Sequence, residues 1–137
     1  MDPSYEERFN AAIQLRNDGE LEISLGLLCQ LYSERSEVSI TLPIIGGILM
    51  TLSRYSEAAH YFRLHTNTKP LNWISSMALY SALLNADRID EALAEGSRFL
   101  NLMESGVSVI PNRNHTDQME IAEYVEEVKQ LLNSYQQ

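Results

Sequence analysis

The chain has 137 residues, of which 45% are hydrophobic and 21% charged, and this balance is typical of one soluble domain that buries its own core. Ten basic and nineteen acidic residues give a formal net charge of −9, and because no basic run occurs, nucleic acid is not an expected partner. The single cysteine, Cys29, excludes an internal disulfide, and no apolar stretch approaches the twenty or so residues of a membrane-spanning helix. The first residues include neither a basic leader nor an apolar segment, so we expect a cytoplasmic protein without membrane contact.

Helical periodicity interrupted by turn residues predicts seven helices. In chain order they cover residues 4–17, 21–34, 40–52, 55–67, 72–85, 89–103 and 115–135. Ser4 can cap the first helix, with Glu7 three residues later in a capping-box pattern, and Asp2 followed by Pro3 is a competing cap. Proline is tolerated only in the first turn of a helix, so Pro43 predicts that the third helix begins late or is tightly wound at its start.

One short pattern occurs three times along the chain. Residues 19–24, 53–58 and 87–92 each contain a turn residue, a polar residue, a bulky apolar residue, two mostly polar residues and a small residue. The small residues recur every 34 positions, at Ser24, Ala58 and Ala92. Such a pattern indicates a helix–turn–helix unit, in which the small residue lets the two backbones approach each other.

A 34-residue helix pair of this kind resembles the tetratricopeptide repeat. The resemblance covers three units, at about 5–38, 39–72 and 73–106, within a single domain 1–137. The second unit matches the family's preferences best, at Gly46, Leu49, Tyr55, Ala58, Phe62 and Pro70. The resemblance implies an all-α fold, a right-handed superhelix of antiparallel helix pairs that is called an α-solenoid.

The third unit departs from the family pattern at two positions. Tyr80 stands where a small residue is expected, and Gly96 stands where a large one is expected. One hypothesis is that these two residues exchange volume across the same seam, and the alternative is a locally irregular third unit.

Beyond the repeats, residues 104–114 break the period and predict a loop that packs down through its apolar residues. The last helix, 115–135, has one apolar stripe, formed by Ile121, Val125, Val128, Leu132 and Tyr135. A terminal unit of a solenoid needs an inner apolar face and an outer polar face, so we expect a capping helix. The alternative is a helix that mediates dimerisation or folds over the groove.

No pattern in the sequence indicates catalysis. His60 and His65 are five residues apart, where zinc-binding pairs on a helix prefer a spacing of about three or four, and neither these nor His115 have a cysteine partner nearby. We therefore expect no enzyme, no metal site and no cofactor.

The resemblance further implies a concave groove lined by the first helix of each pair. The residues expected to line it are Phe9, Ile13, Arg16, Ile40, Pro43, Gly47, Met50, Ile74, Met77, Ser81 and Leu84. Family members that clamp an acidic C-terminus line the groove with Lys, Arg and Asn, whereas here Arg16, Asn17 and Asn85 are the only candidates. A mostly apolar lining instead favours an amphipathic helix or an extended apolar peptide. Alternatively, loop 104–114 or the last helix fills the groove from within.

These observations favour a protein-interaction module, such as a small chaperone or adaptor. A second hypothesis is an immunity or inhibitor protein that neutralises a basic toxin. Its contacts would be the acidic ends of the chain, with Glu6, Glu7, Glu120, Glu123, Glu126 and Glu127. A third is a structural protein that works as a homodimer.

Overall fold

The computed structural model describes residues 3–106 and 115–135, and all regular secondary structure within them is helical. The helices are α1 (Pro3–Asn17), α2 (Leu21–Glu34), α3 (Thr41–Thr51), α4 (Tyr55–Thr68), α5 (Trp73–Asn85), α6 (Ile89–Glu104) and α7 (His115–Tyr135). Each end lies within one residue of the prediction, and α3 begins at Thr41, so Pro43 falls in its first turn as expected. Most of the predicted loop 104–114 lies outside the described residues.

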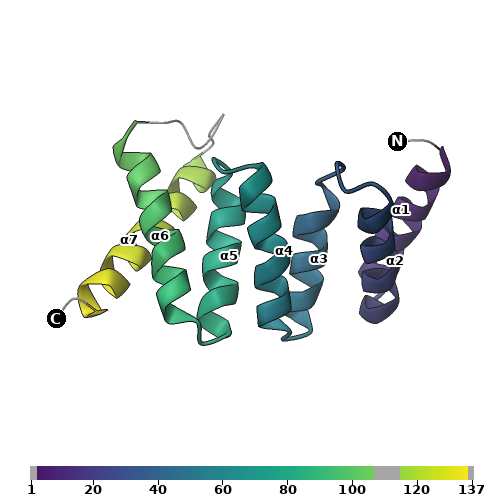
Figure 1. Cartoon of the computed structure of the whole chain (residues 1–137), viewed down its shortest axis with the longest axis horizontal. Helices are drawn as coiled ribbons and strands as arrows, with labels where there is room; N and C mark the ends of the chain where they lie inside the picture. Colours follow the sequence, from purple (N-terminus) through teal and green to yellow (C-terminus); the bar gives the residue numbers. More distant parts are fainter. Residues whose placement is uncertain (1–2, 107–114, 136–137) are drawn as a thin grey trace.

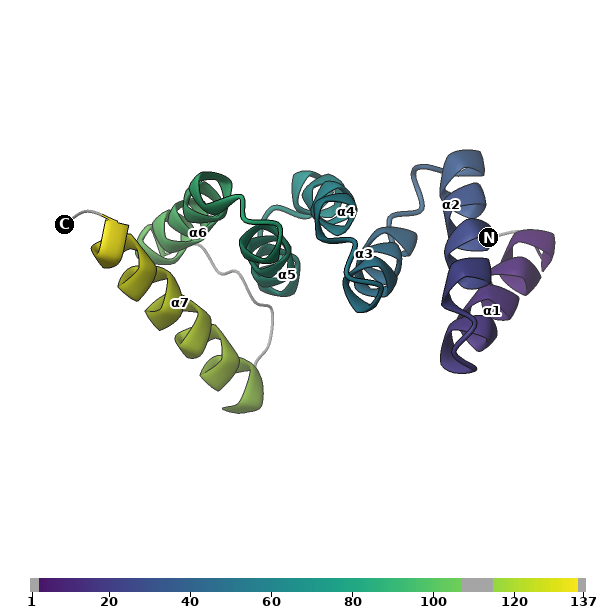
Figure 2. The same cartoon turned by 90° about the horizontal axis from the view of Figure 1, so that it is seen from below.

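The helices stand side by side in chain order and form two layers. Helices α1, α3 and α5 lie on one side of the molecule, and α2, α4 and α6 lie on the other (Figures 1 and 2). Helix α7 lies beside α6, on the same side as α5, and crosses the others at an angle (Figure 2). The chain therefore forms an α-solenoid of helix pairs, with a seventh helix at one end.

The same turn joins the two helices of each pair. A residue with positive φ recurs every 34 positions, namely Gly19 (88°), Ser53 (59°) and Asp87 (61°). The next N–H in each turn donates to the carbonyl five residues back, from Glu20 to Leu15 at 2.8 Å, from Arg54 to Leu49 at 2.8 Å and from Arg88 to Leu83 at 2.9 Å. This is the Schellman arrangement, which satisfies the last carbonyls of the first helix and reverses the chain. The same chain reversal therefore recurs at each 34-residue interval of the sequence pattern.

Small residues bring the two backbones of a pair together, as the sequence pattern indicates. Ser24, Ala58 and Ala92 are fully buried. The hydroxyl of Ser24 donates to the carbonyl of Ala12 at 2.7 Å, so serine is accommodated where the family pattern has alanine. In the second pair, Gly46 has the same role, since an added Cβ would lie 2.6 Å from the ring of Phe62.

Both departures of the third unit lie at the contact with α7. Tyr80 is fully buried, and its ring packs edge-on against Tyr124 with 5.4 Å between the centroids. A Cβ on Gly96 would lie 2.6 Å from a methyl group of Val128. The hypothesis that Tyr80 and Gly96 exchange volume with each other is therefore wrong. The atoms nearest to the space beside Gly96 belong to Val128 of α7.

The buried stripe of α7 differs from the predicted one. Ile121 and Val128 are buried as expected, but the third buried member is Tyr124, while Tyr135 is 58% exposed. Tyr124 also shares a hydrogen bond of 2.9 Å with the Ser76 hydroxyl, which in turn donates to the buried carboxylate of Glu95 at 2.7 Å. This network joins α5, α6 and α7, and so holds the last helix on the third pair.

Candidate functional site

The residues predicted to line the groove lie on the layer formed by α1, α3 and α5 (Figure 2). None of the eleven is buried. Ile40 and Ile74 are the most exposed of the large apolar members, at 51% and 55%. Ile23 on α2 and Met119 on α7 are equally or nearly as exposed, so exposure of single apolar side chains does not by itself single out this layer.

On α5, the four predicted groove residues form a stripe, of which Met77 and Leu84 also pack against the core. Ile74 is exposed, and Met77, Ser81 and Leu84 are half-buried, at helical spacing. Leu79 on the opposite side of α5 and Tyr80 at the edge of the stripe are fully buried. Burial of Tyr80 raises the pKa of its hydroxyl to about 12, so the phenol stays neutral near pH 7. The predicted face of α5 is thus partly exposed, while its other side belongs to the core.

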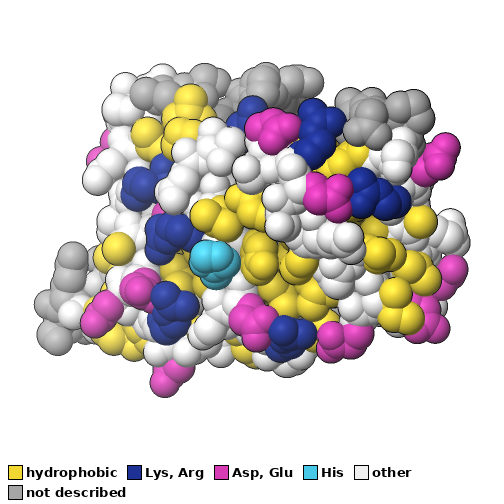
Figure 3. Space-filling model, turned by 45° about the vertical axis from the view of Figure 1, so that its right-hand side comes forward, with side chains coloured by type: hydrophobic (Ala, Val, Ile, Leu, Met, Phe, Trp, Pro, Cys, Tyr) yellow, Lys and Arg dark blue, Asp and Glu magenta, His cyan; other side chains and the backbone are white. Residues whose placement is uncertain are grey.

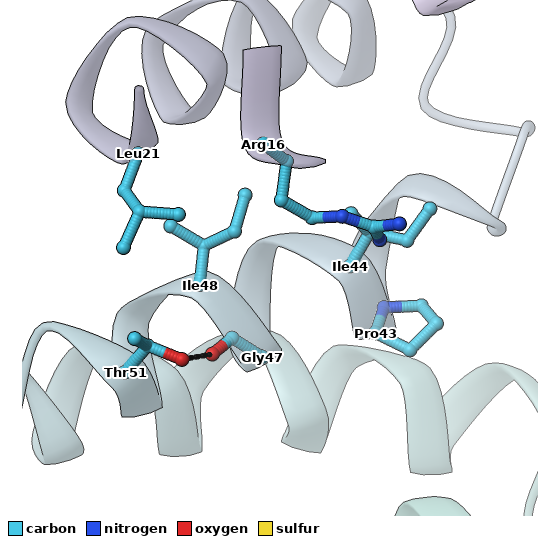
Figure 4. Close-up of a pocket in the computed structure, with 7 residues that line it drawn as sticks. All are labelled: Arg16, Leu21, Pro43, Ile44, Gly47, Ile48 and Thr51. Atoms are coloured by element: carbon cyan, nitrogen blue, oxygen red, sulfur yellow. Dashed lines mark hydrogen bonds between the residues drawn. The ribbon is translucent and has the colours of Figure 1, made fainter. Parts of the chain in front are cut away.

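A pocket of about 270 Å³ opens between the first helix pair and α3. Its lining is formed by Arg16, Leu21, Pro43, Ile44, Gly47, Ile48 and Thr51. Arg16 and Leu21 project from the first pair toward α3, which supplies the other five residues (Figure 4). Three of the predicted groove residues, Arg16, Pro43 and Gly47, therefore come together in one pocket.

Four lining residues were missed by the sequence analysis, namely Leu21, Ile44, Ile48 and Thr51. Three of them lie on α3, and with Gly47 they follow the spacing of one helix face. The pocket face of α3 is rotated about the helix axis relative to the predicted stripe. The predicted stripe includes Ile40 and Met50, and neither residue lines the pocket. The spacing was visible in the sequence, but the direction in which the first pair leans on α3 was not.

Glycine at position 47 keeps the pocket open. Gly47 lies in the middle of α3, and a Cβ added there would meet no atom within 4 Å. Its carbonyl accepts a hydrogen bond from the hydroxyl of Thr51 at 3.1 Å, so the polar group of Thr51 is satisfied within the helix (Figure 4). The floor and walls are then supplied mainly by apolar side chains, with Ile48 almost fully buried.

Arg16 is the charged member of the lining, and its charge is not neutralised by a neighbour. Its guanidinium donates to the side-chain oxygen of Asn17, with 3.1 Å between Nη2 and Oδ1. Within residues 3–106 and 115–135, Arg16 is the arginine without an ion pair to a carboxylate. The paired arginines are Arg8 with Glu34, Arg35 with Glu37, Arg54 with Glu57, Arg63 and Arg98 with Glu95, and Arg88 with Glu91. In a chain this acidic, a positive charge beside an apolar pocket is an exception.

A second hollow, of about 300 Å³, lies between α4, α5 and the start of α6. His60, Arg63 and Arg88 contribute its polar lining. Arg88 is paired with Glu91, whereas Arg63 shares the carboxylate of Glu95 with Arg98, so one acidic group serves two arginines there. In the view of Figure 3, basic and acidic side chains lie next to one another with apolar side chains between them. On the left of that view several basic side chains lie near the histidine, with acidic side chains at the lower end of this group.

The acidic residues proposed to contact a basic toxin are all exposed. They do not gather on one surface, however, because Glu6 and Glu7 lie on α1 and the others lie on α7, at the opposite end of the molecule (Figure 1). A single compact partner would therefore meet only one of the two groups.

The described residues offer no arrangement that indicates a metal centre. No group of three or more His, Cys, Asp or Glu side chains in residues 3–106 and 115–135 is placed to hold a metal ion. His65 is buried and shares a hydrogen bond with the hydroxyl of Ser75, while His60 is exposed. Burial, with the charge of Lys69, lowers the pKa of His65 below its usual value. Across the same described residues, no helix combines the length and the apolar character needed to cross a membrane.

Comparisons with known proteins show what this fold is similar to. No protein-family model matches the chain, and no curated protein sequence matches it. Among solved structures, the Yersinia enterocolitica type III secretion chaperone SycD, in complex with a peptide of the translocator YopD, matches with a TM-score of 0.74 and 14% identity, over 94% of this chain and 95% of that chain. SycD in an alternative dimer matches with a TM-score of 0.71 and 14% identity, over 94% of each chain.

MamA from Desulfovibrio magneticus RS-1 matches with a TM-score of 0.65 and 15% identity, over 95% of this chain and 76% of that chain. SycD and MamA are tetratricopeptide-like α-solenoids, and this chain has the same all-α architecture. At these identities the similarity concerns the fold alone.

Proposed function

We propose that this chain is a non-catalytic, cytoplasmic protein-interaction module that holds an apolar or amphipathic segment of a partner protein, as a small chaperone or adaptor does. The segment lies on the layer of α1, α3 and α5. One observation carries the proposal: three of the predicted groove residues, Arg16, Pro43 and Gly47, line one pocket between the first pair and α3. Ile40 and Ile74, predicted for the same groove, are more than half exposed. The fold is similar to that of SycD, which is known in complex with a peptide of its partner.

Assignment to the tetratricopeptide family, with three units, is part of the proposal. It is supported by the turn that recurs at Gly19, Ser53 and Asp87 with the same hydrogen bonds. Groove residues predicted from the family pattern are at least partly exposed, which a binding role requires.

The test compares two variants, a double substitution that includes Ile74 and a single substitution of the equally exposed Ile23. Ile74 on α5 and Ile23 on α2 are both 55% exposed, but α5 and α2 belong to opposite layers. Co-purification from the native cell at low and high salt, with identification by mass spectrometry, provides the partner. We then expect Ile74→Asp combined with Met77→Asp to abolish binding of the isolated partner segment, whereas Ile23→Asp retains it. Circular dichroism confirms that both variants are folded.

Equal binding by the groove variant, the Ile23→Asp control and the wild type would contradict this function. A partner that is basic and is lost at high salt, with binding that depends on the glutamates of α7, would instead favour the inhibitor hypothesis.

A homodimer is a second candidate, because one of the similar SycD structures is a dimer. Light scattering over a wide range of protein concentration tests it. A mass near 15.6 kDa at every concentration excludes the dimer, and a doubling with concentration supports it.

A further inference from the structure

We propose that the pocket between the first helix pair and α3 anchors one apolar side chain of the partner segment, and that Arg16 selects an aspartate or glutamate next to that side chain. The inference rests on the proposed function and deepens it, since it states the chemistry of the segment. The inference has two parts, the apolar anchor and the acidic neighbour. A different substitution tests each part.

The anchor part follows from the shape and lining of the pocket. About 270 Å³ of space lies between Leu21 on one side and Ile44 and Ile48 on the other. Gly47 leaves that space open, because no atom lies within 4 Å of where its Cβ would be. Full burial of one aliphatic or aromatic side chain strengthens binding by about ten- to a hundredfold. The pocket can therefore account for a large share of the affinity for a short segment.

The acidic part follows from the charge of Arg16. The other arginines of the described residues are all engaged by glutamates, as given above, while Arg16 contacts only the amide oxygen of Asn17. A guanidinium presents several N–H donors in a planar fork that matches a carboxylate. An apolar pocket with one unneutralised arginine thus favours an apolar side chain with an Asp or Glu beside it.

The carboxylate belongs to a side chain within the segment and not to the end of a chain. Exposed or half-buried apolar residues continue on both sides of the pocket, with Phe9 and Ile13 on α1 and Ile74 and Met77 on α5. A segment that lies on this face therefore extends past the pocket in both directions. A terminal carboxylate is captured by several converging donors, whereas the lining supplies one charged donor group, that of Arg16.

The probe for the test is a display library of short random peptides, held between constant linkers so that no terminal carboxylate is free. Selection on the wild-type protein is expected to enrich an apolar residue with an adjacent Asp or Glu. The most enriched peptide is then made with amidated C-terminus and titrated by fluorescence anisotropy against the wild type and the variants.

Gly47→Leu tests the anchor. The added side chain fills the pocket, and we expect the affinity to fall by about tenfold or more. The thermal stability is expected to stay the same or rise, because leucine is a better helix former than glycine. Gly26→Leu is the matched control, since Gly26 also lies within a helix, α2, and its Cβ would also meet no atom within 4 Å. Gly47→Ala serves as a milder variant.

Arg16→Glu tests the acidic neighbour. We expect it to weaken binding of the acidic peptide by about tenfold, the scale of a charge-assisted hydrogen bond, and to restore binding when the peptide acid is replaced by lysine. Lys129→Glu is the matched control, since it makes the same change in net charge on the exposed side of α7. Arg16→Gln removes the charge without reversing it.

The outcomes separate this inference from the proposed function. In one outcome, a peptide loses its affinity for the Ile74→Asp, Met77→Asp variant but binds Gly47→Leu and Arg16→Glu as tightly as the wild type. This outcome overturns the inference and leaves the proposed function standing. Enrichment without acidic residues, or a preference for free C-termini in a second library, overturns the acidic part. A library from which no peptide is enriched overturns both the inference and the proposed function.

Discussion

The junctions between helix pairs differ, although the repeat places them at equivalent positions. Where α4 meets α5, His65 shares a hydrogen bond with the Ser75 hydroxyl, and the side chain of Asn72 accepts one from the backbone N–H of Ser75 at 3.1 Å. Trp73 opens α5 and is buried. Polar contacts and a large aromatic ring thus close the junction of the second and third pairs.

Where α2 meets α3, the residues 34 positions earlier make none of these contacts. Leu31 and Thr41 stand in the places of His65 and Ser75, and the Thr41 hydroxyl donates to the carbonyl of Val38 within its own segment. Ser39 stands in the place of Trp73. Helices α2 and α3 pack less extensively than α4 and α5, and the pocket with Arg16 lies on this side. Less extensive packing at one junction therefore accompanies the pocket with Arg16.

The largest expected effect comes from weakening the packing where α4 meets α5, the closed junction, so that it resembles the less packed open junction where α2 meets α3. Trp73→Ala removes a buried aromatic ring and is expected to lower the free energy of unfolding by about 3–5 kcal/mol. Ser39→Ala, at the equivalent half-buried position of the other junction, should change it by about 0.5 kcal/mol or less. Urea denaturation measures both. Equal losses for the two substitutions would show that the junctions do not differ energetically.

A smaller loss is expected at the contact between α6 and α7, which is also closed. Gly96→Leu places a side chain where Val128 lies, and this overpacking should lower the free energy of unfolding by about 1–3 kcal/mol. Val128→Ala in the same chain should recover part of the loss, which a double-mutant cycle in urea measures. If Val128→Ala brings no recovery, the strain at Gly96 has another origin.

Two adjacent glycines of α3 should respond in opposite directions. Gly47 faces the open pocket, so Gly47→Ala is expected to raise the free energy of unfolding by about 1 kcal/mol, because alanine is the better helix former. Gly46 faces the ring of Phe62, so Gly46→Ala is expected to be destabilising. Thermal melts of the two variants check the difference. A loss for Gly47→Ala would mean that the pocket is not open in solution.

The smallest effect concerns the pH dependence of the closed junction. Burial lowers the pKa of His65, so the folded chain takes up this proton less readily than the unfolded chain. Stability from the neutral imidazole is complete above about pH 6.5, the unperturbed value, and falls as the pH drops toward the folded pKa. His65→Gln should flatten this part of the profile, measured as the difference in unfolding free energy between wild type and variant. Parallel profiles would exclude His65 as the source.

Part of the site was predictable from the sequence. Helical spacing and the repeat register place Ile74 and Met77 on one face of α5, and both are at least partly exposed; that this face binds a partner stays a prediction. The pocket lining was predicted only in part, since Ile44 and Ile48 depend on how the first pair leans on α3. Tyr124 was missed as a buried residue because α7 meets the third pair at an angle that no local pattern encodes.

The sequence by itself determined the seven helices and the 34-residue turns. Their causes are local: periodic apolar residues, small residues at close approaches, and a left-handed residue at the end of each first helix. Only the tertiary structure decided that Gly96 and Tyr80 contact α7 and that the two junctions between pairs differ in packing. It also decided that Arg16 forms no ion pair with a carboxylate of residues 3–106 and 115–135. These outcomes depend on many weak contacts between residues far apart in the chain, and such contacts leave no periodic trace in the sequence.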